Sequence, residues 1–326
     1  MLRKLSFALL FVLVLSGAAR LSAGEVINLK LGFVDPESSM YAQGGKKLAE
    51  EVEKATNGRI KIEVLSGGVL GGERDMYEGA QMGTIDMCSV VNVVLSNFIP
   101  ELKILDQPFL FDSVEQAHKV IDGPFGDLIN EKAMQQDVHI VGWFESGFRN
   151  TFSNKPITTL ADFKGFKIRT MENKMQIDSF NALGAVATPM AASEQFTALQ
   201  QGTIDGCENA IANMLTNRYY EVIQNVTWTN HLYTLIAICM SDRAWNRIPA
   251  DIRPAFLEGV KKGVAYQRKL LIDGNAEAVK ELGEKHGVKF HNIDMDTVKA
   301  AVKPVIDAFK STLDSKVVEI VEASKK

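Results

Sequence analysis

A short segment that occurs twice restricts the fold of this chain more than any other feature. Residues 83–88 (GTIDMC) return as residues 202–207 (GTIDGC), 119 positions further along. The context matches too, since an aromatic residue and a glutamine precede each copy at the same spacing. A glycine in this position suits the left-handed end of a helix, so each copy predicts a helix followed at once by a strand. The repeat therefore predicts two lobes built on one plan.

Hydrophobic periodicity predicts alternating strands and helices in the first third of the chain. Apolar residues alternate over 27–33, 60–64 and 85–90, which indicates strands. Residues 38–56 and 73–82 between them have the composition and caps of helices. Strands that alternate with helices are typical of an α/β sheet.

The rest of the chain continues this pattern and adds one long helix. Strands are expected at 138–143, 165–170, 232–240 and 288–290, and helices at 173–183 and 296–321. Residues 248–286 contain few helix breakers and repeat an apolar residue every four positions. At ~1.5 Å per residue such a helix is long enough to cross both lobes.

The first 23 residues have the pattern of a secretory signal peptide. Arg3 and Lys4 precede an apolar run over 5–15 and then small residues. A run of about 11 residues is too short for a ~30 Å hydrocarbon core, which disfavours the alternative of a membrane anchor. Cleavage leaves 33 basic and 40 acidic residues, a net charge of −7. We therefore expect a periplasmic protein that does not bind nucleic acid.

The sequence contains no recognisable catalytic or metal-binding motif. Hydrophobic residues make up 46% and charged residues 23% of the chain, which excludes a disordered or disulfide-dense protein. Its five histidines lack the spacing of zinc ligands, and no glycine-rich loop has the lysine of a phosphate-binding loop. The three cysteines (Cys88, Cys207 and Cys239) form no CxxC pair, and no disulfide between Cys88 and Cys207 is expected because they lie in different lobes. We therefore expect no cofactor, no metal and no enzymatic activity. The alternative from another functional class is a two-lobe enzyme that acts on a small organic acid, because the residues of a catalytic triad meet in space and need not form a sequence motif.

Arginines and an amide stand at the ends of predicted strands. Arg149 follows the strand over 138–143, Arg169 closes the next strand, and Asn209 follows the second copy of the repeat. Ligands of open α/β sheets bind at the carboxyl ends of strands, and a guanidinium there can hold a carboxylate through two parallel hydrogen bonds. The competing interpretation of each arginine is a structural salt bridge.

Several ordered motifs between residues 27 and 245 resemble the solute-binding component of TRAP transporters, the DctP-like family. They are GGERDM at 71–76, QPFLF at 107–111, GFRN at 147–150, DFKGFKIR at 162–169, GAVATPM at 184–190, and the dense run from Ser193 through ALQQG at 198–202 to Asn209. The resemblance implies a two-lobe, periplasmic-binding-protein-like α/β fold with a central cleft, crossed by a long helix. It divides the mature chain into lobe I (24–146 plus 235–273) and lobe II (147–234 plus 274–326).

The resemblance also implies roles for individual residues. Arg169 matches the arginine that clamps the ligand's carboxylate in this family. Arg149 matches a second cleft arginine, and Asn209 matches the amide that orients the carboxylate. Glu73 matches a first-lobe position that contacts the far end of the ligand.

Three positions depart from the pattern of the family. Val34 and Val91 stand at or near positions that are polar in its sugar-acid binders, and Ala192 stands where a bulky aromatic residue is common in the family. These departures predict a roomier, less polar cleft and favour a carboxylate with an apolar or aromatic body.

The sequence thus predicts an extracytoplasmic receptor that closes about a hinge on an organic acid and delivers it to the membrane permease subunits of a TRAP transporter. A sugar acid or a C4-dicarboxylate is the alternative ligand within the family. We expect a monomer in solution.

Overall fold

The computed structural model describes residues 26–325. The predicted signal peptide (1–23) lies outside the described residues. Within 26–325, none of the helices combines the length and apolar character needed to cross a membrane.

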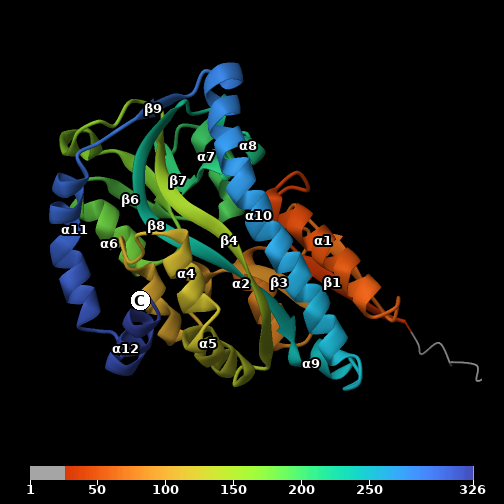
Figure 1. Ribbon diagram of the computed structural model, residues 1–326. Coiled ribbons are helices and arrows are strands. Elements are labelled where there is room, and N and C mark those ends of the chain that lie inside the picture. The colour runs from red at the N-terminus through yellow and green to blue at the C-terminus, as the bar shows by residue number, and fades with distance from the viewer. Residues whose placement is uncertain (1–25, 326) are drawn as a thin grey trace, which may run out of the picture.

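The described chain forms a mixed α/β structure around one sheet (Figure 1). The strands are β1 (Ile27–Gly32), β2 (Ile60–Leu65), β3 (Met87–Val91), β4 (Val138–Ser153), β5 (Lys167–Thr170), β6 (Val186–Pro189), β7 (Gly206–Ala210), β8 (Asn225–Ser241) and β9 (Lys289–His291). The α-helices are α1 (Met40–Ala55), α2 (Glu73–Gln81), α3 (Asn92–Leu95), α4 (Val114–Ile121), α5 (Pro124–Met134), α6 (Lys174–Ala182), α7 (Gln195–Gln200), α8 (Ile211–Thr216), α9 (Asp242–Asn246), α10 (Arg253–His286), α11 (Met295–Lys310) and α12 (Ser315–Ser324). Short 3-10 helices are η1 (Pro100–Asp106), η2 (Leu160–Phe163), η3 (Ala192–Glu194) and η4 (Tyr219–Glu221).

The sheet has the two-fold plan that the sequence repeat predicts. Its order is β2-β1-β3-β8-β4-β7-β5-β6, with β9 joined to β8. The outer triplets are parallel, and each meets a long central strand in antiparallel fashion, β3 on β8 and β7 on β4. The two-lobe fold is therefore confirmed, with β2-β1-β3 and β6-β5-β7 as matching halves.

The glycines of the repeat end equivalent helices. Gly83 follows α2 and Gly202 follows α7, and both have φ of +69°. A side chain is strained in this left-handed conformation, whereas glycine adopts it freely. Each glycine therefore stops its helix and turns the chain into the strand that follows.

The aspartates of the repeat make equivalent hydrogen bonds in the two halves. The Asp86 carboxylate accepts a hydrogen bond from the backbone nitrogen of Lys30 at 3.1 Å. Asp205 accepts one from the backbone nitrogen of Lys167 at 3.0 Å. Each carboxylate thus ties the start of β3 or β7 to its parallel neighbour, β1 or β5.

Three long elements connect the halves. Strands β4 and β8 run together from the β3 side of the sheet to the β7 side, and α10 packs on α1, on β4 and on α8 (Figure 1). The β4–β8 register shifts between Glu145 and Gly147, where Gly147 has φ of +88°. A bulge with a left-handed glycine bends a strand, so this part of β4 is suited to a hinge.

The structure corrects three expected elements. The strand predicted at 138–143 extends to Ser153, because it continues through the bulges into the second half. The strand predicted at 232–240 begins already at Asn225 for the same reason, since it pairs with β4 in both halves. The single helix predicted over 296–321 is broken into α11 and α12, and Asp314 caps α12 by accepting from the backbone nitrogen of Lys316 at 2.8 Å.

The C-terminal helices pack on different cores. Val298 and Val302 of α11 lie in the cluster around β5 and α6, whereas Val317 and Val321 of α12 lie in the cluster of α4 and α5. The division of the chain into 24–146 plus 235–273 and 147–234 plus 274–326 stays a prediction. It assigns α12 to lobe II, although α12 packs on helices α4 and α5 of lobe I.

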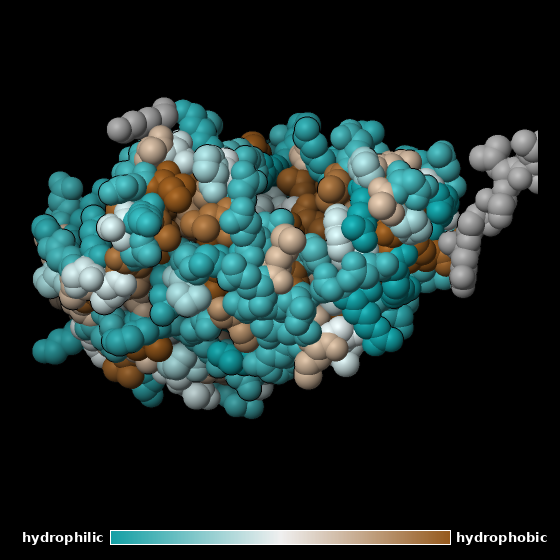
Figure 2. Space-filling view, turned by 90° about the horizontal axis from the view of Figure 1, so that it is seen from below, coloured by the Kyte–Doolittle hydropathy of each residue, from teal (hydrophilic) through white to brown (hydrophobic). Residues whose placement is uncertain are grey.

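Polar side chains cover most of the face shown in Figure 2, and the apolar ones gather in small separate groups. The cysteines are buried: Cys88 faces Cys239 across β3 and β8, and Cys207 lies on β7. Because β8 and β4 lie between β3 and β7, Cys88 and Cys207 are at least roughly 14 Å apart across the sheet. They are also far apart along the strands, since Cys88 is level with Ile140 of β4 and Cys207 with Phe152, so a disulfide between them is out of reach.

Candidate functional site

A cleft of about 320 Å³ lies between the two halves of the sheet. One wall comes from the loop after β1 and the start of α2, and the other from the end of β5 and the loop between β6 and α7. Its lining residues are Val34, Gly72, Glu73, Arg74, Asp75, Val94, Arg169, Met171, Glu172, Pro189, Met190, Ala191, Ala192, Ser193 and Glu194. Val34, Glu73, Arg169 and Ala192 were all predicted from the sequence, and the fold brings them together here.

Arg169 is a buried cation without a carboxylate partner in the described part of the chain. Its side chain lies on β5 and is 3% exposed. Nε and Nη2 both donate to the carbonyl oxygen of Met190, at 2.9 and 2.7 Å. Burial lowers the pKa of this guanidinium, although the nearby charge of Glu208 opposes the change. Buried charges are normally paired, so the environment of Arg169 is suited to binding an anion.

Arg149, in contrast, already has an anion. Its Nε donates to the carboxylate of Glu208, and its Nη2 donates to the same carboxylate at 2.9 Å and to the Glu208 carbonyl oxygen at 2.6 Å. His231 Nε2 lies 3.2 Å from the same carboxylate. Burial alone would raise the pKa of Glu208, but the charge of Arg149 and the bonds from His231 and Arg149 lower it to about 2. The sequence reasoning missed Glu208 as the partner of Arg149, and a role of Arg149 toward ligand stays a prediction.

Asn209 is held in one orientation on β7. Its Oδ1 accepts from the backbone nitrogen of Ala210 at 2.9 Å and from Asn213 Nδ2 at 2.7 Å. With the oxygen engaged, the Nδ2 amide is the donor that remains for a carboxylate. Asn213 also donates to the Tyr41 hydroxyl at 2.9 Å, and Tyr41 donates to Ser146 at 2.7 Å. This chain of polar groups links the second half of the sheet to α1.

Glu73 opens α2 on the opposite wall. Its Oε1 accepts from the backbone nitrogen of Val91 at 2.7 Å, so the predicted residue Val91 acts here through its main chain. Burial raises the pKa of Glu73 to about 7, and the charge of Asp35 adds to this, although the Val91 bond and Arg169 oppose it.

Asp35 is the acidic residue that the sequence reasoning missed. It lies three residues beyond the end of β1, next to Val34. Burial raises the pKa of Asp35 to about 6, and a hydrogen bond from Asn217 and the charge of Arg149 oppose this rise. The rule that singled out Arg169, a polar residue at the carboxyl end of a strand, also singles out Asp35. The lining of the cleft thus has Glu73 on the first wall and Arg169 on the second. Asp35 lies close enough to Glu73 and Arg149 to affect their charges, but the predicted residues Arg149, Asn209 and Val91, like Asp35, are not among the residues that line this cleft.

The raised pKa of Glu73 predicts a loss of stability as the pH rises. The folded state holds this proton more tightly than the unfolded chain, whose glutamate has a pKa near 4.5. The stability is therefore complete below pH 4.5 and declines as the pH passes through 7. For the ligand-free protein we expect Glu73→Gln to remove on the order of 2 kcal/mol of the loss between pH 5 and pH 8, measured by chemical unfolding. The matched control is Glu78→Gln, an exposed position on the same helix, which should leave the loss as in wild type.

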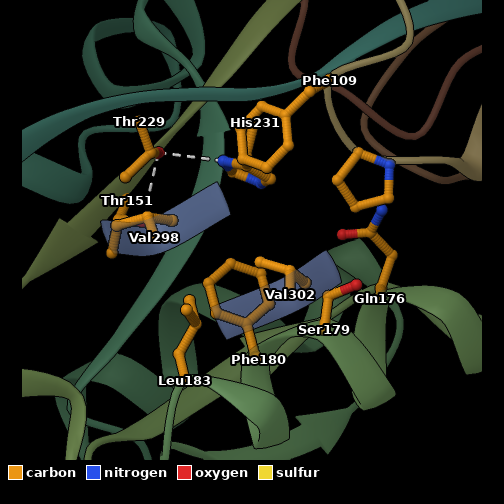
Figure 3. Close-up of a pocket in the computed structure, with 11 residues that line it drawn as sticks. Phe109, Thr151, Gln176, Ser179, Phe180, Leu183, Thr229, His231, Val298 and Val302 are labelled. Carbon is orange, nitrogen blue, oxygen red and sulfur yellow. Dashed lines mark hydrogen bonds between the residues drawn. The ribbon is translucent and has the colours of Figure 1, made fainter. Parts of the chain in front are cut away.

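A second, smaller cavity lies among β8, α6 and α11 (Figure 3). Figure 3 shows Phe109, Phe180 and His231 around it, and His231 Nδ1 lies 2.9 Å from the Thr229 hydroxyl. Its volume of about 20 Å³ has room for a water molecule and not for an organic acid. In the described chain, no group of three or more histidine, cysteine, aspartate or glutamate side chains is arranged to hold a metal ion.

Comparison with known proteins gives consistent matches over nearly the whole chain. Residues 31–312 match the family model described as DctP, bacterial extracellular solute-binding protein, family 7. A solute-binding protein of Verminephrobacter eiseniae is 32% identical over 305 residues, which cover 93% of this chain and 91% of the relative.

Two solved structures have the same fold. The sugar acid binding protein DctPAm of Advenella mimigardefordensis, in complex with galactonate, is 29% identical with a TM-score of 0.88, and the match covers 92% of this chain and 98% of that one. A TRAP periplasmic solute-binding protein of Polaromonas bound to D-erythronate is 35% identical with a TM-score of 0.86, covering 91% and 98%.

Proposed function

The chain belongs to family 7 of the bacterial extracellular solute-binding proteins, the DctP family, and from this premise we propose that its ligand is a sugar acid. It is a solute receptor that binds an organic acid through the carboxylate and serves a TRAP-type secondary transporter. We further propose that it acts in the periplasm after loss of residues 1–23, as a monomer that passes its ligand unchanged to the membrane permease subunits.

The observation that carries the carboxylate assignment is the environment of Arg169. A carboxylate placed against Nη1 and Nη2 would supply the counter-charge that the described residues do not. The Nδ2 amide of Asn209 supports this end of the ligand, since its oxygen is already engaged. Charge-assisted bidentate pairs of this kind are the strong hydrogen bonds of binding sites.

The first wall favours a ligand with several hydroxyl groups. Glu73 on this wall and Asp35 close to it offer carboxyl oxygens that accept hydrogen bonds from hydroxyls, and a second carboxylate placed here would meet the charge of Asp35, whose pKa of about 6 leaves it mostly ionised at pH 7. We therefore favour the sugar-acid alternative over a body that is apolar or aromatic and over a C4-dicarboxylate. Val34 and Ala192 are small side chains in the lining, so the cleft of about 320 Å³ has room for the hydroxylated body of such a ligand. The relatives bound to galactonate and D-erythronate carry ligands of this class.

Calorimetric titration tests the proposal. Galactonate, erythronate and galacturonate are compared with succinate, phenylacetate and the neutral polyol galactitol. We expect at least one sugar acid to bind about tenfold or more tightly than succinate and phenylacetate, and galactitol to give no measurable heat, because it lacks the carboxylate for Arg169. Tightest binding by succinate would favour a C4-dicarboxylate as the ligand, and tightest binding by phenylacetate would favour an acid with an apolar or aromatic body. Formation of a product from a bound acid would show that the protein is an enzyme.

A further inference from the structure

The turn that follows the Arg169 strand is anchored in the opposite half of the molecule. Met171, just beyond β5, packs into the core cluster of α3, η1 and α4. The carbonyl oxygen of Glu172 accepts from Asn97 Nδ2 at 3.2 Å. The end of β5 is thus attached to the first lobe by contacts that do not involve the ligand.

The strongest of these contacts is fully buried. Asn173 Nδ2 donates to Asp106 Oδ2 at 2.7 Å and lies 3.3 Å from the Ser96 hydroxyl, which itself donates to Asp106 Oδ2 at 2.7 Å. Asp106 and Ser96 are each 1% exposed, and Asn173 is 6% exposed. Three polar side chains from two lobes are therefore removed from water together. Their hydrogen bonds to one another engage Asp106 Oδ2, whereas Asp106 Oδ1 is buried without a hydrogen-bond partner among the described residues.

Asn173 serves α6 and the contact at the same time. Its Oδ1 caps α6 by accepting from the backbone nitrogen of Gln176 at 3.2 Å, while its Nδ2 reaches Asp106. A shift of Asp106 relative to Asn173 would therefore move α6 and, four residues before Asn173, the guanidinium of Arg169. The two roles use different atoms of one side chain, so substitution can separate them.

We propose that Ser96, Asp106 and Asn173 form a latch that holds the lobes closed, and that Asp106 is a positioning residue for the ligand-binding Arg169. This inference rests on the proposed function, since it concerns the closed state in which Arg169 holds the acid. The latch makes no contact with the ligand, so it sets affinity through the population of the closed state. A ligand that binds the closed state gains apparent affinity in proportion to that population.

The burial of Asp106 makes an amide its conservative replacement. Burial raises the pKa of Asp106 to about 8, although the bonds from Ser96 and Asn173 and the charge of Lys103 oppose this. The carboxyl group is therefore mostly neutral near pH 7, and asparagine preserves its shape, its neutrality and an acceptor oxygen. Leucine keeps the branching and the number of side-chain heavy atoms, is somewhat larger, and removes the acceptor.

The test compares three variants by stopped-flow and calorimetric binding of galactonate, or of whichever sugar acid the wild type binds best. Asn173→Ser keeps an efficient N-cap for α6 and loses the donor to Asp106. We expect Asn173→Ser and Asp106→Leu each to weaken binding by roughly 5- to 50-fold, mostly as faster dissociation. Asp106→Asn should stay within about threefold of wild type.

A merely structural role would give a different pattern. It would lower the melting temperature of the ligand-free protein and leave the dissociation rate unchanged, and that outcome would overturn the latch. The matched control is Asn181→Ser, in which an asparagine of the same helix loses a bond to the backbone nitrogen of Ala187 within the second lobe. It should not change binding.

A ligand-free measurement keeps the latch separate from the choice of ligand. The native cysteines are all buried, so thiol labels can be directed to Glu53→Cys on α1 and Lys164→Cys beside β5. We expect Asn173→Ser to lengthen the mean distance between the labels without ligand. If the wild type binds none of the sugar acids, the proposed ligand class is wrong. The distance between the labels is measured without ligand, so it still shows whether the latch holds the lobes together. An unchanged distance overturns the latch whatever acid binds.

Discussion

Replacing Arg169 with alanine should weaken binding of the preferred acid by about 30-fold to several thousand-fold. Arg169 is buried, and its acceptor in the described structure is a neutral carbonyl, so a bound carboxylate would be its counter-ion. Loss of one partner of a buried charge pair costs ~2–5 kcal/mol, because the other charge stays unpaired, and each ~1.4 kcal/mol is a factor of ten in affinity. Calorimetric titration of the folded variant measures the loss.

Two further variants make this experiment specific. Arg169→Lys keeps the charge and loses the planar fork, so it should recover only part of the affinity. Arg59→Ala is the matched control, since Arg59 is an arginine outside the cleft that forms an exposed pair with Asp251 at 3.1 Å. It should change affinity by less than about threefold, because it does not contact the cleft. Binding of Arg169→Ala within threefold of wild type would show that the ligand need not be an acid.

Replacing Arg149 with alanine should instead lower the free energy of unfolding, by about 3–5 kcal/mol at pH 7. The Glu208 carboxylate that Arg149 neutralises is 0% exposed, and a buried charge left without its partner is strongly destabilising. Chemical unfolding of the ligand-free variant measures the change. Because the pKa of Glu208 is lowered to about 2, this stabilisation is present above the unfolded pKa of 4.5 and is lost as the pH falls towards 2.

The double variant Arg149→Met with Glu208→Leu should recover most of the lost stability, since apolar residues of similar volume can replace a buried pair at little cost. The exposed pair of Arg59 and Asp251 is the control, and Arg59→Ala should cost less than ~1 kcal/mol. A loss below that value for Arg149→Ala would show that Glu208 is neutralised by another route, with His231 at 3.2 Å as the nearest candidate.

The contrast between the two arginines shows where sequence reasoning reached its limit. Arg149 and Arg169 both lie near the predicted ends of strands, and both align with cleft arginines of the DctP family. Only the packed structure places Glu208 against Arg149 and a neutral carbonyl against Arg169, because the register of β4, β5 and β7 decides which side chains meet. Asp35 was overlooked although it obeys the same strand-end rule.

The sequence by itself determined the local elements and their two-fold plan. The repeated GTID segment predicted matching helix ends and strands, since a left-handed glycine acts on its own turn of the chain. The hydrogen bonds of its aspartates, in contrast, reach backbone 56 and 38 residues away and became visible only in the structure. The long helix was predicted from its period for the same reason. Only the tertiary structure decided that the helix expected over 296–321 breaks before α12, which of two arginines lacks a counter-charge, and that Asn173 meets Asp106. These outcomes depend on contacts between residues far apart in the chain, and local periodicity carries no information about which distant groups will share one buried environment.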